Sequence, residues 1–550
     1  MHSNDARDAD VVIVGSGVAG ALIATRLAAA GAKVRILEAG PRTDRAAAVT
    51  RYRSGLYAYE SPEWAPQPTT SDLDVYYVQA GPVKFSSDYE RRVGGTTWHW
   101  LGNCPRLLPS DFEMKTRFGV GVDWPLSYDE LEPWYVDAEH ELGVSGNSEH
   151  NDGSPRSAPY PMPGLPFASG DRMFQEAAKT LGLELLQTPQ ARNAEPGYQG
   201  RSQCCGNATC IPVCPVQAKY DATYHLDLAE KAGVEITENA VVFNVVSGSN
   251  GAIEKVQYKD PDGTVHDVTA TLFVVAANGI ETPKLLLISK GEYSPNGIAN
   301  ASDQVGRHLA DHPEARVRAL VPRPYAGYRG PLQLSGIDSV REGDFRSERA
   351  AIRLQVSHSV GSPMTVAGNL IAQGKAGAAL FSEIAKVAPY QVRLASMIEQ
   401  LPDANNRVTV DETQVDALGI PRPKLSYSYD DYVMGGWKAA NELHDQLLAA
   451  VGATDIVHDE ELGGVGHLLG TVRMGTDPAT SVTDGYGRTH DYPNLYLAGS
   501  GLFPTTGTAN PTLTISALAL RSAARIAREL GLTPVATPSA SPASPVATPA

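Results

Sequence analysis

The chain has no excess of basic residues. Its 550 residues include 46 Lys and Arg against 62 Asp and Glu, a formal net charge of −16. Because nucleic acid and anionic lipid repel such a charge, we expect neither as the main partner, and a neutral ligand fits better. The hydrophobic share of 42% and charged share of 20% are ordinary for a globular protein, and the length allows two or more domains.

Long uninterrupted hydrophobic runs are also missing. The most apolar stretch, residues 11–30, follows three aspartates where a signal peptide carries positive charge, and three glycines interrupt it. These features argue against a signal peptide and against a membrane span, and no span is expected elsewhere. A protein of this kind that works outside the cytoplasm needs a partner to carry it there.

Cysteine is scarce, yet four of the five cysteines fall within eleven residues: Cys204, Cys205, Cys210 and Cys214. A disulfide framework spreads its cysteines along the chain, and zinc sites usually show two Cys-x2-Cys pairs. Closely spaced thiols without histidine, next to glycine and proline, favour an iron–sulfur cluster, with zinc or a disulfide as alternatives. The isolated Cys104 is expected to be a small buried side chain.

The first forty residues predict a strand, a glycine-rich turn, a helix and a second strand. The turn reads Gly15-x-Gly17-x-x-Gly20, and Glu38 ends the second strand. In a dinucleotide fold the first glycine permits the tight turn, the second lets the backbone approach a pyrophosphate and the third packs helix on strand. Glu38 is then placed to bind a ribose hydroxyl. The pattern suits FAD and NAD alike.

Further elements predict a discontinuous nucleotide domain. Strands are expected at 240–247, 253–258, 266–276 and 494–498, and helices at 281–289, 432–451 and 512–530, whereas residues 41–90 look irregular. Alternating polar and apolar residues near 316–321 and 424–429 indicate a mostly antiparallel sheet. The expected division is a nucleotide domain of 8–115, 216–311 and 456–532, a substrate domain of 116–200 and 312–455, a cysteine loop of 201–215 and a disordered tail of 533–550.

Four segments resemble the glucose–methanol–choline (GMC) family of FAD oxidoreductases: Arg91-Arg-Val-Gly-Gly-Thr-Thr-Trp-His-Trp100, Val305-Gly-Arg-His-Leu-Ala-Asp-His-Pro313, His467-Leu-Leu-Gly-Thr-Val-Arg-Met-Gly475 and Gly507-Thr-Ala-Asn-Pro-Thr512. The resemblance extends over nearly the whole chain. It implies an α/β fold with a Rossmann-like, p-hydroxybenzoate-hydroxylase-like FAD-binding domain and an inserted α+β substrate domain built on an antiparallel sheet. The cofactor it implies is FAD.

The cysteine loop is similar to that of the FAD-dependent sugar dehydrogenases of the glucose and fructose type, which carry a [3Fe-4S] cluster. This resemblance implies Cys204, Cys210 and Cys214 as cluster ligands and leaves Cys205 spare. It also implies a small companion subunit exported by the twin-arginine route and a cytochrome c or quinone acceptor. The location is then periplasmic, or membrane-associated through the partners, and cytoplasmic if there is no partner.

The same resemblance implies roles for single residues. His467 matches the catalytic base and Asn510 the second polar residue of the site; the flavin contacts implied are Gly94, Gly95, Thr96 and Thr97 beside the pyrophosphate, His99 at the flavin, where a covalent bond is possible, Val242 near adenine and Gly501. From the residues alone, Asn510 before Pro511 is also typical of a helix N-cap. Where many members have aspartate this chain has Gly499, and the small residues 463–466 leave room for a bulkier substrate such as a glycoside.

We therefore expect a dehydrogenase that oxidises a hydroxyl of a sugar, glycoside or polyol and passes electrons from flavin through the cluster to an external acceptor. One alternative is a GMC oxidase that uses oxygen and keeps the cysteine loop for structure. Another is a non-catalytic redox subunit, which needs neither His467 nor a substrate pocket.

Overall fold

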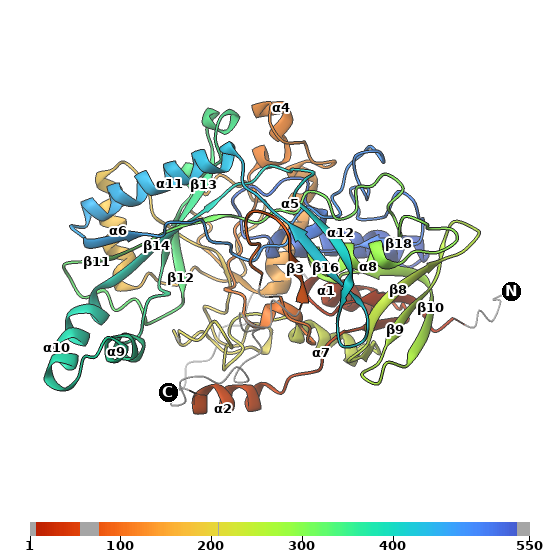
Figure 1. The fold of residues 1–550 in the computed structure, drawn as a ribbon, viewed down its shortest axis with the longest axis horizontal. Coiled ribbons are helices and arrows are strands. Elements are labelled where there is room, and N and C mark those ends of the chain that lie inside the picture. Colours follow the sequence, from red (N-terminus) through yellow and green to blue (C-terminus); the bar gives the residue numbers. More distant parts are fainter. Residues whose placement is uncertain (1–6, 56–75, 88, 207, 536–550) are drawn as a thin grey trace, which may run out of the picture.

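The structure is a computed structural model that describes residues 7–55, 76–87, 89–206 and 208–535. Two sheets lie at opposite ends of an elongated molecule (Figure 1). Within the described part, no helix combines the length and hydrophobicity needed to cross a membrane. The helices are α1 (Val18–Ala29), α2 (Arg45–Gly55), α4 (Met114–Phe118), α5 (Tyr128–Leu142), α6 (Ser169–Thr180), α7 (Thr223–Lys231), α8 (Asn278–Ile288), α9 (Pro363–Ala372), α10 (Gly377–Val387), α11 (Asp431–Ala450) and α12 (Thr512–Glu529).

The first sheet is mixed, with seven strands. Its order is β7 (Glu235–Thr237), β2 (Val34–Leu37), β1 (Ala9–Val14), β10 (Val265–Val275), β9 (Ile253–Lys259) and β8 (Val241–Ser247), and β18 (Leu495–Leu497) also pairs with β10. Strand β1 runs parallel to both β2 and β10. The predicted strand, helix, strand opening is confirmed, and so are the expected strands after residue 240 and the three expected helices.

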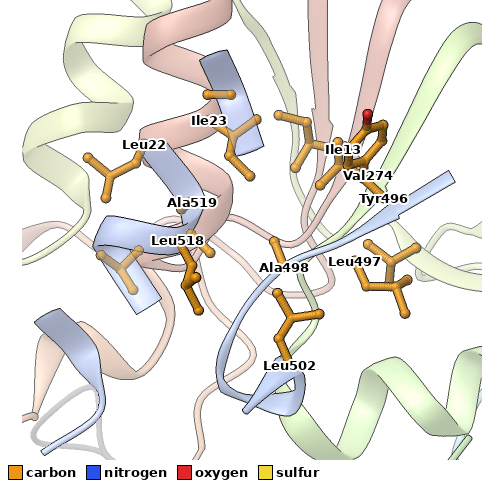
Figure 2. Packing of buried hydrophobic residues seen from close by; sticks show 14 of the residues in the cluster. Ile13, Leu22, Ile23, Val274, Tyr496, Leu497, Ala498, Leu502, Leu518 and Ala519 are labelled. Atoms are coloured by element: carbon orange, nitrogen blue, oxygen red, sulfur yellow. The ribbon is translucent and has the colours of Figure 1, made fainter. Parts of the chain in front are cut away.

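Helices α1 and α12 pack together on this sheet. The β1 strand is apolar on both faces, with Val11, Val12 and Ile13 fully buried, which is typical of a parallel strand covered on both sides. Ile23 of α1 and Leu518 of α12 belong to the same buried cluster as Ile13 of β1, and Figure 2 shows part of this cluster. The packing of α1 against α12 holds the first residues of both helices at the same edge of the first sheet.

The second sheet has six strands in the order β17 (Thr454–His458), β11 (Glu314–Leu320), β14 (Gln391–Ile398), β13 (Ile352–Ser357), β12 (Gln333–Ile337) and β5 (Leu186–Gln187). All of its pairings are antiparallel, as the alternating pattern predicts. Helices α6 and α11 share its separate apolar core. Residues of β12, β13 and β14 reach toward the first sheet, where they line the candidate site described below.

Small elements join the two halves. Strand β16 (Pro421–Ser426) pairs with β15 (Arg407–Val415) and β3 (Val78–Gln79) in a sheet of its own, and β4 (Val144–Ser145) pairs with β6 (Gln190–Ala191).

Three features differ from the sequence expectations. Helix α2 occupies part of the stretch that looks irregular. The sequence does not predict this helix, because its residues show no apolar periodicity. Helix α5 belongs to the core of the first sheet and packs on α12, although it falls in the range expected for the substrate domain. Strand β16 does not join the large antiparallel sheet. The expected disordered tail lies, from residue 536, outside the described residues.

Candidate active site

The three glycines of the first turn have three different environments. Gly15 has φ of +99°, and an added Cβ would lie 2.6 Å from the Ala276 carbonyl oxygen, so the turn requires glycine. A Cβ on Gly20 would lie 2.1 Å from the Gly15 oxygen, so this glycine lets the helix pack closely. A Cβ on Gly17 would meet nothing within 4 Å, because Gly17 faces an open cavity. These are the environments that the dinucleotide pattern predicts.

Glu38 is buried next to this turn. Its carboxylate accepts hydrogen bonds from the Ser16 backbone N–H at 2.9 Å, the Ser16 hydroxyl at 2.6 Å and the Gly40 N–H at 3.0 Å. Burial raises the pKa of Glu38, and these donors oppose the shift. Glu38 thus both braces the turn and lines a cavity that can take a ribose.

Two adjoining cavities bring most of the predicted residues together. The smaller, of about 120 Å³, is lined among others by Gly15, Gly17, Glu38, Gly95, Thr96 and Val242. The larger, of about 330 Å³, is lined among others by Gly17, Thr96, Thr97, His99, His467 and Asn510. Gly17, Thr96 and Asn278 line both, so the cavities are continuous around the first turn of α1. An elongated dinucleotide fits such a paired cavity, with its pyrophosphate at the helix N-terminus.

The segment from Gly94 to Trp100 forms one wall. The Thr97 hydroxyl donates to the Gly94 carbonyl at 2.5 Å and accepts from the Ala222 N–H at 2.9 Å, which fixes the turn. Gly94 itself has φ of +93° and does not line either cavity. His99 lines the larger cavity, and its contact with a flavin stays a prediction.

His467 is held by a buried carboxylate. Asp311 accepts four backbone N–H bonds, from His312 at 2.7 Å, Val465 at 3.0 Å, Gly466 at 3.1 Å and His467 at 2.9 Å. Burial raises the pKa of Asp311 to about 7, against the effect of these donors. Since the four bonds occupy both oxygens, we assign the carboxylate form, and it fixes the backbone that carries His467.

The ring of His467 lies 2.8 Å, Nδ1 to Nδ1, from His312. Nε2 of His312 lies 3.2 and 3.1 Å from the carbonyl oxygens of Thr506 and Gly507, so it must donate. Burial lowers the pKa of His312 to about 4 and that of His467 well below its usual value, so both rings are neutral at pH 7. The hydrogen-bond network therefore assigns the His467 proton to Nδ1 and leaves Nε2 as a free base.

Asn510 lies at the start of α12 but does not cap it. The helix begins at Thr512 after Pro511, and no side-chain hydrogen bond caps it. The expected capping role is therefore wrong, since proline takes the cap position itself. The Asn510 Oδ1 atom is buried and has no hydrogen-bond partner among the described residues, and Asn510 lines the larger cavity. This oxygen remains available to a ligand.

The cysteine loop touches the same cavity. Cys210 is buried, Cys204 and Cys214 are half-buried and Cys205 is exposed. Ile211, next to Cys210, lines the larger cavity beside His99. Behind this wall the buried Lys219 ammonium donates to carbonyl oxygens of Trp98 at 2.9 Å, Trp100 at 2.5 Å and Cys210 at 2.9 Å. Burial lowers the pKa of Lys219 to about 8.

Some residues of the site differ from the sequence predictions. Gly501 lies behind the larger cavity, where a Cβ would lie 2.9 Å from Val472, whereas Gly499 and Ser500 line it. Gly499 has φ of +119° and open space at its Cβ position, so its backbone faces the cavity. The sequence analysis also missed several polar residues that line the cavity, among them Asn103, Gln333 and Gln355. Nothing in their local sequence marks them.

Comparisons with known proteins agree with this geometry. Residues 10–297 match the family of FAD-dependent oxidoreductases and residues 402–519 match GMC oxidoreductases. The chain is 40% identical to the fructose dehydrogenase large subunit of Gluconobacter japonicus, over 96% of this chain and 99% of the relative. It is 30% identical to 2-methyl-1,2-propanediol dehydrogenase of Mycolicibacterium austroafricanum, over 96% of each chain.

Among solved structures, pyridoxine 4-oxidase from Mesorbium loti superposes with a TM-score of 0.66 over 94% of this chain and 99% of that chain. At 18% identity this likeness concerns the fold alone. The matches over both halves of the sequence, together with the glycine turn and the paired cavity, lead to one conclusion: the chain belongs to the GMC family of FAD-dependent oxidoreductases.

Proposed function

We propose that the protein is a dehydrogenase that oxidises a hydroxyl of a sugar, glycoside or polyol and passes the electrons through an iron–sulfur cluster to an external acceptor. The observation that carries the proposal is one cavity lined by the glycine turn, by His467 and Asn510, and by Ile211 of the cysteine loop. The proposed flavin site, the proposed base and the cysteine loop thus share the lining of one cavity.

The residues that would hold FAD are those of the paired cavity. Gly17 offers open space for the pyrophosphate, Glu38 an acceptor for a ribose hydroxyl and Val242 a backbone contact near adenine. His99 and Thr97 would lie at the flavin end. When bound, FAD supplies an acceptor for the hydride that leaves the substrate carbon.

His467 is the proposed base. Its unprotonated Nε2 accepts the hydroxyl proton while the C–H bond breaks, and its Nδ1–H bond to His312 holds the ring in this tautomer. The Asn510 side chain binds the same hydroxyl from the other side. Because Thr512 and Ile515 also line the cavity, the positive end of the α12 dipole faces the site, where it stabilises negative charge.

The polar wall of the cavity supports a polyhydroxy substrate. Asn103 Oδ1 and Gln355 Nε2 are buried, and in the described part of the chain neither has a hydrogen-bond partner. Gln355 is 1% exposed, so its amide cannot bond to bulk water. An acceptor and a donor left open in one cavity match ring hydroxyls, which both donate and accept.

The cysteine loop is proposed to bind a [3Fe-4S] cluster through Cys204, Cys210 and Cys214. These three thiols are buried or half-buried while Cys205 is exposed, which supports the proposed ligand set. Since the Gluconobacter japonicus relative is named a large subunit, we propose a small companion subunit carrying a twin-arginine signal, a cytochrome c or quinone acceptor and a periplasmic location.

The test is anaerobic titration of the purified protein, co-expressed with its companion subunit, with D-fructose, D-glucose, a glycoside and glycerol. We expect at least one of them to bleach the flavin, and iron analysis to give about three iron atoms per flavin. Failure of all four, with FAD bound, would contradict the substrate class.

A second candidate is an oxidase, because the chain is also 31% identical to paromamine 6'-oxidase of Streptomyces fradiae over 96% of this chain. An oxidase forms hydrogen peroxide in proportion to the substrate oxidised and needs no iron. Measuring peroxide and iron in the same aerobic reaction separates the two functions.

A further inference from the structure

Arg192 is a buried cation whose partners are incomplete. The residue is 2% exposed, and its Nη2 donates to the Leu101 carbonyl oxygen at 2.8 Å. Its Nε and Nη1 atoms are buried and have no acceptor in the described part of the chain, where no carboxylate pairs with it either. Burying an uncompensated guanidinium is strongly destabilising, so the fold indicates an anion at this place.

The position of Arg192 identifies that anion. The carbonyl oxygen of the next residue, Asn193, accepts the Cys204 N–H at 2.9 Å, and Arg192 forms a backbone bridge with Lys219. Lys219 in turn donates to the Cys210 carbonyl oxygen. Along the backbone, Arg192 thus neighbours the segments that carry Cys204 and Cys210.

Arg201 provides the contrast. It is 4% exposed, bonds to the Leu142 carbonyl oxygen at 2.8 Å, and likewise has no acceptor for Nε and Nη1 among the described residues. Its guanidinium, however, lies 5.6 Å from the ring centres of both Tyr220 and Tyr224. Aromatic faces compensate this charge. Within the described ranges, no aromatic ring lies under the Arg192 guanidinium in this way.

We propose that Arg192 donates hydrogen bonds from Nε and Nη1 to sulfur atoms of the iron–sulfur cluster held by Cys204, Cys210 and Cys214, and that its fixed charge raises the reduction potential of that cluster. The inference rests on the proposed function. A cluster bound by this loop would gain one negative charge with each electron that it accepted. A fixed cation next to the loop would therefore favour the reduced cluster over the oxidised one.

The experiment is a redox titration of the full-length holoprotein, followed by electron paramagnetic resonance, in the wild type, Arg192→Met, Arg192→Lys and Arg201→Met. We expect Arg192→Met to shift the equilibrium toward the oxidised cluster at least tenfold, about 59 mV for one electron. Arg192→Lys keeps the charge but loses the planar fork, so its shift is smaller. Arg201→Met, the matched loss of a buried arginine charge, shifts less than Arg192→Met.

The outcomes separate the inference from the proposed function. A wild-type holoprotein without iron or a cluster signal would refute the cluster itself. Iron bound in full, with the same midpoint potential in Arg192→Met as in the wild type, would overturn the inference, and so would an equal shift in Arg201→Met. If Arg192→Met does not assemble, Arg192→Lys decides, because a midpoint equal to that of the wild type refutes the hydrogen bonds.

Discussion

The substitution His312→Phe tests the assigned proton on His467. It keeps a ring of similar size but removes the acceptor, 2.8 Å away, to which His467 Nδ1–H donates. A buried donor that loses its hydrogen-bond partner costs about 1–3 kcal/mol. In His312→Phe this cost raises the free energy of the His467 tautomer with its proton on Nδ1, which is the tautomer that the proposed reaction needs. Because each 1.36 kcal/mol is a factor of ten in rate, flavin reduction should slow about 5- to 150-fold.

The assay is anaerobic stopped-flow reduction of the flavin by a confirmed substrate. His467→Ala removes the base altogether and should slow reduction about 10²- to 10⁴-fold. If His312 acts only through His467, adding His312→Phe to His467→Ala should change the rate less than about twofold.

A matched control is His444→Phe. His444 is likewise buried, with its ring 2.9 Å from the Ser396 hydroxyl, but it does not line the cavity. Its substitution should leave the rate of flavin reduction unchanged. Fully additive effects of His312→Phe and His467→Ala would refute the reasoning, because they would mean that His312 serves the reaction independently.

The Asn510→Ala enzyme should reduce its flavin more slowly, by about 5- to 150-fold for one lost hydrogen bond, while thermal unfolding stays near that of the wild type because Asn510 caps no helix. In the iron analysis, Cys210→Ser should lose iron and Cys205→Ser should keep it, since Cys210 is buried and Cys205 exposed; the reverse result would refute the ligand set. Burial lowers the pKa of His308 and of His444 to about 3, so below pH 6.5 the unfolded chain binds protons that the folded chain does not. Each of the two histidines should therefore lower the free energy of unfolding by about 2 kcal/mol between pH 7 and pH 5. Urea titrations should show that the free energy of unfolding of His444→Phe falls by about 2 kcal/mol less than that of the wild type over this range.

Local patterns in the sequence were enough to predict the nucleotide half of the fold. Strand β1, the glycine turn and α1 are contiguous, and each of the three glycines has its own steric reason to be glycine. The antiparallel sheet was also predictable, because β11 alternates buried and less buried residues along one strand. Helix α5 was assigned to the wrong core, since nothing within its own sequence tells which sheet its apolar face meets.

The site was only partly predictable for a similar reason. His467 and His312 are 155 residues apart, and the bond between their rings depends on how two distant loops meet. The segment that carries Asp311 was recognised as part of the family resemblance, yet its sequence does not reveal that its carboxylate binds four N–H groups. Nothing in the sequence distinguishes Gln355 from the other glutamines, and only the position of its strand brings it to the cavity wall.

The hydrogen-bond chain from His467 through His312 ends at backbone carbonyl oxygens. Beyond His467 the next ring is His312, and the partners of its Nε2 in the described part of the chain are the carbonyl oxygens of Thr506 and Gly507, which accept hydrogen bonds but do not take up a proton at neutral pH. We therefore expect a proton captured by His467, the proposed base, to leave through the cavity and not by way of the His312 ring. A bound product would block this route, so we expect His467 to recover its unprotonated form only when the product departs.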